Sequence, residues 1–189
     1  MLDATKNIEN LREQTSFLLE KQEDLYSFCK ERFEELLSIV KAKVVESETD
    51  KNQVEKLNSI SKVLGEHSQK VLGEIESDVS FLKEQLEVIE EVESGNDLAK
   101  KEELISAMME NEELLEMEEF REDVLQEVED SKKGFDTVVE DLISALEEGN
   151  LDEVLVYLQE MEDHEEKESG CCGGECHSGC EDCSSCDDE

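Results

Sequence analysis

Apolar residues recur at steps of three or four along most of the chain, which is the spacing of one face of an α-helix. Four stretches carry this pattern, at about residues 3–46, 50–93, 98–148 and 151–165. Short polar sequences separate them, and Asp50 with Gln53 three positions later has the form of a helix-capping box. The pattern predicts an all-α protein with three long helices and a short fourth.

The apolar stripes of these helices are wide, which favours a bundle over a two-stranded zipper. The stripe of the first helix contains Ala4, Ile8, Leu11, Leu18, Leu25, Cys29, Phe33, Leu36, Val40 and Val44. Short connections make neighbouring helices antiparallel. We therefore expect an elongated antiparallel helical bundle or coiled coil over residues 1–165, followed by a flexible, acidic, Cys-rich tail over residues 166–189.

Five residues within the helices carry separate expectations. Cys29 lies in the apolar stripe and is expected to be a small buried residue, as free cysteines commonly are. His67 flanks the stripe without a Cys or a second His at helical spacing, so we expect it on the surface. Gly65 and Gly73 are expected to mark close packing. Gly134 is expected to bend the third helix or split it in two.

The charge is strongly negative and unevenly distributed. The 189 residues carry a net charge of −37 with neither proline nor tryptophan. Residues 1–70 hold 11 basic and 14 acidic residues, whereas residues 71–189 hold 7 and 41. Such a field repels nucleic-acid phosphates and anionic membrane surfaces. We expect no nucleic-acid or membrane binding and a protein partner, a basic one being favoured, with a homodimer as another option. The alternative is that the charge only keeps long helices in solution.

Six of the seven cysteines lie in the last 21 residues, and their sulfurs are soft donors. Cys180, Cys183 and Cys186 are each separated by two residues, which lets neighbouring thiolates reach one ion. The triple also matches the core of a bacterial ferredoxin run. It lacks the fourth cysteine three residues later and the closing proline, so a further ligand would come from upstream.

The sequence therefore predicts a thiolate site for zinc, copper(I) or an Fe–S cluster. Its expected ligands are Cys172, Cys176, Cys180, Cys183 and Cys186, with Cys171 and His177 as further donors. Two alternatives stay open at this stage. The thiols could form disulfides or act in redox chemistry, or the tail could be inert.

No motif of a catalytic site occurs, whether a phosphate-binding Gly-rich loop, a nucleophile elbow or a His-Glu-x-x-His pair, so we expect no enzymatic activity. No stretch has the apolar length of a signal peptide or a membrane span, and we expect a cytoplasmic, reducing location. Three functions fit: a helical interaction or scaffold protein with a metal-binding tail, a metallochaperone or metal store, and an acidic chaperone or adaptor for a basic client.

Overall fold

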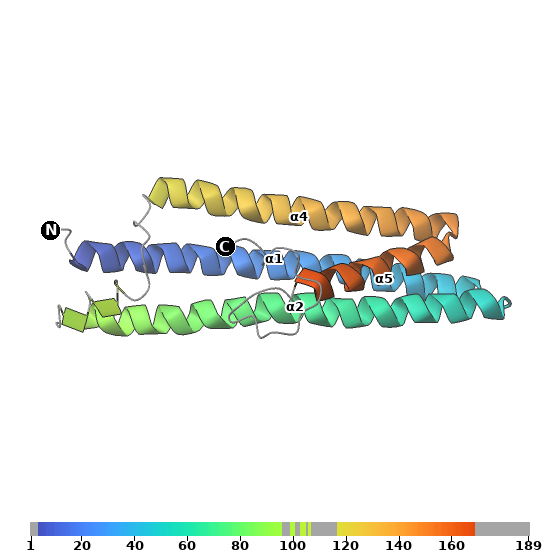
Figure 1. Ribbon diagram of the computed structural model, residues 1–189, viewed down its shortest axis with the longest axis horizontal. Helices are drawn as coiled ribbons and strands as arrows, with labels where there is room; N and C mark the ends of the chain where they lie inside the picture. Colours follow the sequence, from blue (N-terminus) through green and yellow to red (C-terminus); the bar gives the residue numbers. More distant parts are fainter. Residues whose placement is uncertain (1–3, 96–98, 101–102, 105, 107–116, 169–189) are drawn as a thin grey trace, which may run out of the picture.

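A computed structural model describes residues 4–95, 99–100, 103–104, 106 and 117–168. These residues form the helices α1 (Ala4–Glu46), α2 (Lys51–Ser94), α4 (Met117–Glu148) and α5 (Leu151–Glu168), shown in Figure 1. The predicted helical bundle is confirmed for this part of the chain. The expected start of the third helix near residue 98, its course through residues 107–116 and the Cys-rich tail lie outside the described residues.

Asp50 starts α2 as the sequence predicts. Its carboxylate accepts hydrogen bonds from the backbone N–H groups of Asn52 (3.1 Å) and Gln53 (3.2 Å), which the first turn of a helix leaves without partners. The side chain of Gln53 does not return to the Asp50 backbone as in a full capping box. It accepts instead from the Ser47 hydroxyl at 3.1 Å, while the Asp50 N–H donates to the Ser47 carbonyl at 2.8 Å.

A second tight turn reverses the chain between α4 and α5. Gly149 has φ +81°, a conformation that side chains with a Cβ rarely adopt. The N–H of Gly149 donates to the carbonyl of Leu146 at 3.2 Å, and the N–H of Asn150 donates to that of Ala145 at 2.9 Å. This pair of bonds ends α4 in a Schellman motif. Helix α5 therefore folds back beside α4 instead of continuing along its axis.

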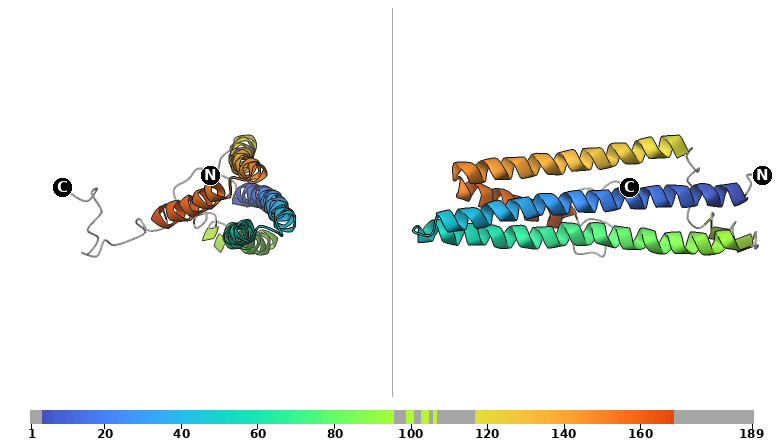
Figure 2. Two further views of the ribbon diagram at one scale, coloured as in Figure 1. Left: turned by 90° about the vertical axis from the view of Figure 1, so that its right-hand side faces the viewer. Right: turned by 180° about the vertical axis from the view of Figure 1, so that it is seen from behind.

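The long helices form an open arrangement with α1 in the middle. Helix α1 packs against α2 on one side and α4 on the other, whereas the backbones of α2 and α4 do not approach each other closely within the described residues. Helix α5 packs against both α2 and α4 near one end of the molecule, as the two views of Figure 2 show. The channel between α2 and α4, with α1 as its floor, is thus filled by α5 at one end only.

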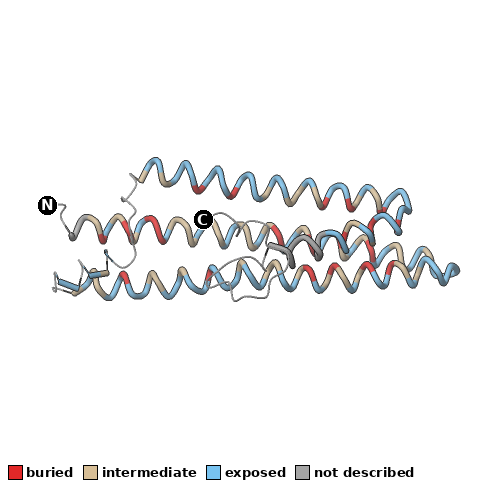
Figure 3. Tube along the Cα trace, in the orientation of Figure 1, coloured by how far each residue is buried: buried red, intermediate tan, exposed pale blue. Residues whose placement is uncertain are grey.

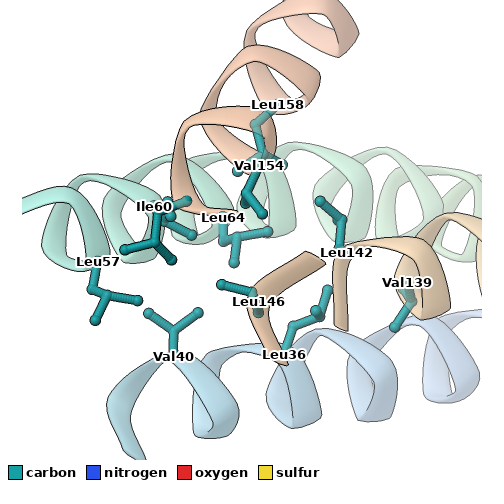
Figure 4. Close-up of a cluster of buried hydrophobic side chains, with 11 residues drawn as sticks. Leu36, Val40, Leu57, Ile60, Leu64, Val139, Leu142, Leu146, Val154 and Leu158 are labelled. Atoms are coloured by element: carbon teal, nitrogen blue, oxygen red, sulfur yellow. The ribbon is translucent and has the colours of Figure 1, made fainter. Parts of the chain in front are cut away.

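The buried side chains form two separate clusters (Figure 3). The larger one joins all four helices around α5 (Figure 4), and it contains Leu36, Val40, Leu57, Ile60, Leu64, Val139, Leu142, Leu146, Leu151, Val154 and Leu158. The smaller one joins Ile8 and Leu11 to Ile89, with Val92 and Leu104 packed against them. Between the clusters the apolar stripes of α1 and α2 continue, but Leu18, Leu25, Ile75 and Leu82 are only half-buried.

His67 corrects one of the sequence-based expectations. It is 6% exposed, and its ring meets that of Phe33 edge to face with the centroids 6.3 Å apart. The expectation of a surface histidine was wrong because the buried face of α2 is wider than the stripe read from the sequence. His67 follows the buried Ile60 by seven residues, which is about two turns, so both side chains face the core.

The glycines of the long helices are a second correction. A Cβ built on Gly65, Gly73 or Gly134 would meet nothing within 4 Å, so none of these glycines is a close-packing point. Helix α4 also passes through Gly134 without interruption. The expectation for Cys29 is confirmed, since this residue is 3% exposed.

Candidate interaction surface

The predicted metal ligands lie outside the described residues, and their arrangement stays a prediction. They are Cys171, Cys172, Cys176, His177, Cys180, Cys183 and Cys186. Within the part of the chain that the structure describes, no group of three or more His, Cys, Asp or Glu side chains is placed to hold a metal ion.

Cys29 is a free thiol inside the bundle. Burial raises its pKa above the ordinary value, and the positive charge of Lys132 opposes this only in part. The thiol therefore stays protonated near neutral pH. Because the thiolate is the reactive form, Cys29 serves as a packing residue and not as a nucleophile.

Helical geometry identifies the faces that line the channel beyond α5. Five turns take 18 residues, so residues 18 apart lie on the same face of a helix. Leu36, Val63 and Val138 belong to or pack against the large cluster that includes α5. Eighteen residues away from them, and in the same direction along the bundle, lie Leu18 on α1, Phe81 on α2 and Phe120 on α4. All three positions are apolar.

These equivalent residues differ sharply in how far they are covered. Leu36 is fully buried beneath α5, whereas Leu18 and Phe120 are half-buried and Phe81 is 60% exposed. Val88, two turns after Phe81, is 45% exposed. We call Leu18, Leu25, Phe81, Val88 and Phe120 the open face. It continues the surface on which α5 packs, without a described helix to cover it.

The length of the open face follows from the lengths of the helices. Helix α4 has 32 residues and α5 has 18, so α5 runs beside little more than half of α4. The remaining 14 residues correspond to about 21 Å at 1.5 Å per residue. The open face is therefore long enough for a helix of about four turns.

Carboxylates dominate the two helices that border the open face. Residues 71–95 of α2 contain eight acidic residues and Lys83, and residues 117–131 of α4 contain seven and Arg121. Both cations are directed at α1, since Lys83 pairs with Glu23 at 2.7 Å and Arg121 lies 5.3 Å from the ring centroid of Phe17. The excess of negative charge on these walls is therefore not neutralised by their own basic residues.

Rings and charges hold α4 on α1. Phe135 of α4 meets Phe28 and Phe33 of α1 edge to face, with centroid separations of 6.4 Å and 5.1 Å. Lys132 lies 5.7 Å from the ring centroid of Phe28. Arg32 Nε and Asp136 Oδ1 form an ion pair at 2.8 Å. These contacts fix one wall of the channel while leaving its mouth open.

Two clefts lie elsewhere on the described surface, and their linings carry no histidine or cysteine. One, of about 330 Å³, separates α4 from α5 and includes Asp141, Glu148 and Tyr157. The other, of about 390 Å³, separates α1 from α2 and contains the Lys83–Glu23 pair. Among the described helices, none combines the length and the apolar character needed to cross a membrane.

The sequence-based reading missed Phe81 and Val88, because it followed only the main stripe of α2 through Val79, Leu82 and Ile89. The available signal was a pair of large apolar residues seven apart on an otherwise acidic flank. Comparisons of the chain with protein-family models, curated proteins and solved structures found no match, so its interpretation depends on this geometry.

Proposed function

We propose that this protein is a non-enzymatic helical interaction protein that carries a thiolate metal-binding tail. The observation that carries the proposal is the open face, where the apolar surface that packs α5 continues for about four turns. Single exposed apolar residues are normal, whereas aligned ones beside a half-buried stripe are typical of binding surfaces.

The chemistry of the described core also supports a binding role. Cys29 and His67 are the reactive side-chain types inside it, and both are packed among aromatic or apolar neighbours. Their burial serves the packing of α1 against α2 and α4. The surface, by contrast, combines apolar contact area with a strong negative charge, which is the combination that selects a protein partner.

The tail contributes the second half of the proposed function. In a reducing compartment its closely spaced thiols stay free to bind a soft ion or cluster. We expect about one zinc ion, copper(I) ion or Fe–S cluster, held by ligands among Cys172, Cys176, Cys180, Cys183 and Cys186.

The interaction is tested by enrichment from extract of the source organism. The full chain is compared with the double variant Phe81→Ser/Val88→Ser and with the matched control Val45→Ser/Val156→Ser, whose residues are 69% and 52% exposed elsewhere. We expect a specific protein that the wild type and the control retain and the open-face variant loses. Equal retention by all three proteins would contradict a role for the open face.

A specific observation favours the acidic chaperone or adaptor as a second candidate. The carboxylate excess on α2 and α4 suits a basic client, and it is independent of the tail. Deletion of residues 169–189 separates the candidates. An adaptor keeps its client after this deletion, whereas a metallochaperone or metal store loses its activity, measured as transfer of the bound metal to a chelating acceptor.

A further inference from the structure

We propose that the open face binds a basic amphipathic helix of about 14 residues from another protein. The proposal rests on the function proposed above, since it names the chemistry of the partner that an interaction protein would take. It commits to one occupant of the channel between α2 and α4 beyond the end of α5. Length, shape, apolar pattern and charge each point to that occupant.

Helix α5 shows what this channel accepts. It packs against α2 and α4 through Leu151, Val154 and Leu158, which recur at steps of three and four on one face of the helix. Lys56 of α2 adds an ion pair of 2.6 Å to Asp152 near the start of α5. An amphipathic helix seated between two flanking helices is a recurrent mode of peptide recognition. The open face extends the same channel by about 21 Å.

Phe81 and Val88 supply the apolar anchors. They lie two turns apart on the face of α2 that Val63 uses to pack against the core around α5. A partner helix with apolar residues at i, i+3 or i+4, and i+7 would bring one of them to each anchor. The half-buried Leu18 and Leu25 of α1 would form the floor of the contact. Aromatic anchors of this kind account for much of the free energy of binding in interfaces.

Charge selects a basic partner over other helices. Lys83 and Arg121, the basic residues of the two wall segments, are directed at α1, as described above. Lysine and arginine side chains that flank the apolar face of a partner would lie beside the carboxylates of both walls. Charge complementarity of this kind raises association rates and disfavours acidic competitors.

A second copy of this chain would fit the apolar pattern less well. Its own open face is bordered by the same carboxylates, so a symmetric dimer would place like charges opposite each other. Such juxtaposition destabilises an interface. The net charge of −37 makes the same argument for the molecule as a whole.

The experiment measures binding of synthetic peptides to the full chain by fluorescence anisotropy. The probe is a labelled 14-residue peptide of leucine and lysine with its leucines on one helical face. A scrambled isomer keeps composition and charge but loses this face, and a third peptide carries glutamate in place of lysine. The protein variants are Phe81→Ser/Val88→Ser and the control Val45→Ser/Val156→Ser.

We expect saturable one-to-one binding of the amphipathic basic peptide and a loss of affinity of at least about tenfold in the open-face variant. The control variant should stay within about twofold of wild type. Addition of salt should weaken binding. Equal binding of the scrambled isomer would show charge attraction only, and equal binding of the acidic peptide would show that charge plays no part. Either result overturns the proposal.

Two other occupants of the open face are further outcomes that would overturn it. A dimer of the wild type that the open-face substitutions dissociate, seen by analytical ultracentrifugation, would identify a second copy. Failure of the peptide to bind the full chain, with cross-links between residues 169–189 and α2, would identify the C-terminal tail. Enrichment of a partner that depends on Phe81 and Val88 would survive a negative peptide result, so failure of the partner class is distinguishable from failure of the proposed function.

Discussion

The glycines of α2 are positions where the backbone carries an avoidable cost. Gly65 and Gly73 lie inside the helix with open space where a Cβ would stand. Alanine there restricts the unfolded chain and improves helix propensity. Each substitution should raise the free energy of unfolding by about 1 kcal/mol, measured by urea denaturation. The control is Gly149→Ala, which should lower it because φ is +81° at that position. A loss of stability at Gly65 or Gly73 would show a contact that the structure does not contain.

Cys29 makes a prediction about high pH. Burial raises its pKa in the folded protein above that in the unfolded chain, so its contribution to stability is present below the ordinary thiol value of 9.0 and is lost as the pH rises through the folded value. The free energy of unfolding of the wild type should therefore fall more steeply above that pH than that of Cys29→Val. Parallel curves for the two proteins would mean that the thiol ionises equally in both states.

At the scale of single helices, the acidic start of α4 should respond to salt. Glu118 with Glu122 and Asp123 with Glu127 place like charges four residues apart, which costs a few tenths of a kcal/mol per pair. Sodium chloride screens such pairs, since the Debye length falls to about 3 Å at 1 M. We expect the melting temperature to rise with salt, most steeply at low ionic strength. A flat or falling melting temperature would show that the fold already compensates this charge.

The helices were predictable from the sequence to within a few residues, because their signals are local. The Asp50 cap and the Gly149 turn act through neighbouring atoms, and the three-to-four spacing marks the apolar faces. Coverage of those faces was not predictable. Whether His67 is buried or Phe81 exposed depends on where α5 lies across the channel, and this is decided by contacts between residues far apart in the sequence.

At the scale of the whole molecule, the tail should be separable from the bundle. The variant Cys180→Ser/Cys183→Ser/Cys186→Ser removes three soft donors and should lose its metal, measured by elemental analysis after anaerobic purification. Its helical circular dichroism should match that of the wild type, because the described core clusters contain none of these residues. Undiminished metal content would overturn the predicted site, and a loss of helicity would show that the metal is structural for the bundle.

The candidate sites differ in what the sequence could supply. The thiolate site is a prediction from spacing alone, since six of the seven cysteines lie in residues 169–189. The open face required the structure, because Leu18, Phe81 and Phe120 come from three different helices. Their shared 18-residue offset from Leu36, Val63 and Val138 becomes visible only once the position of α5 is known.

Site-specific photo-cross-linking in living cells tests the central claim most directly. A photoreactive phenylalanine analogue replaces Phe81 in the full chain and, in a matched control, the exposed Val45. We predict a discrete cross-linked species at position 81, absent at position 45, in which mass spectrometry finds a Lys- and Arg-rich helical segment of another protein. The same cross-linking at both positions, or cross-links from position 81 only to this chain itself, would contradict the account.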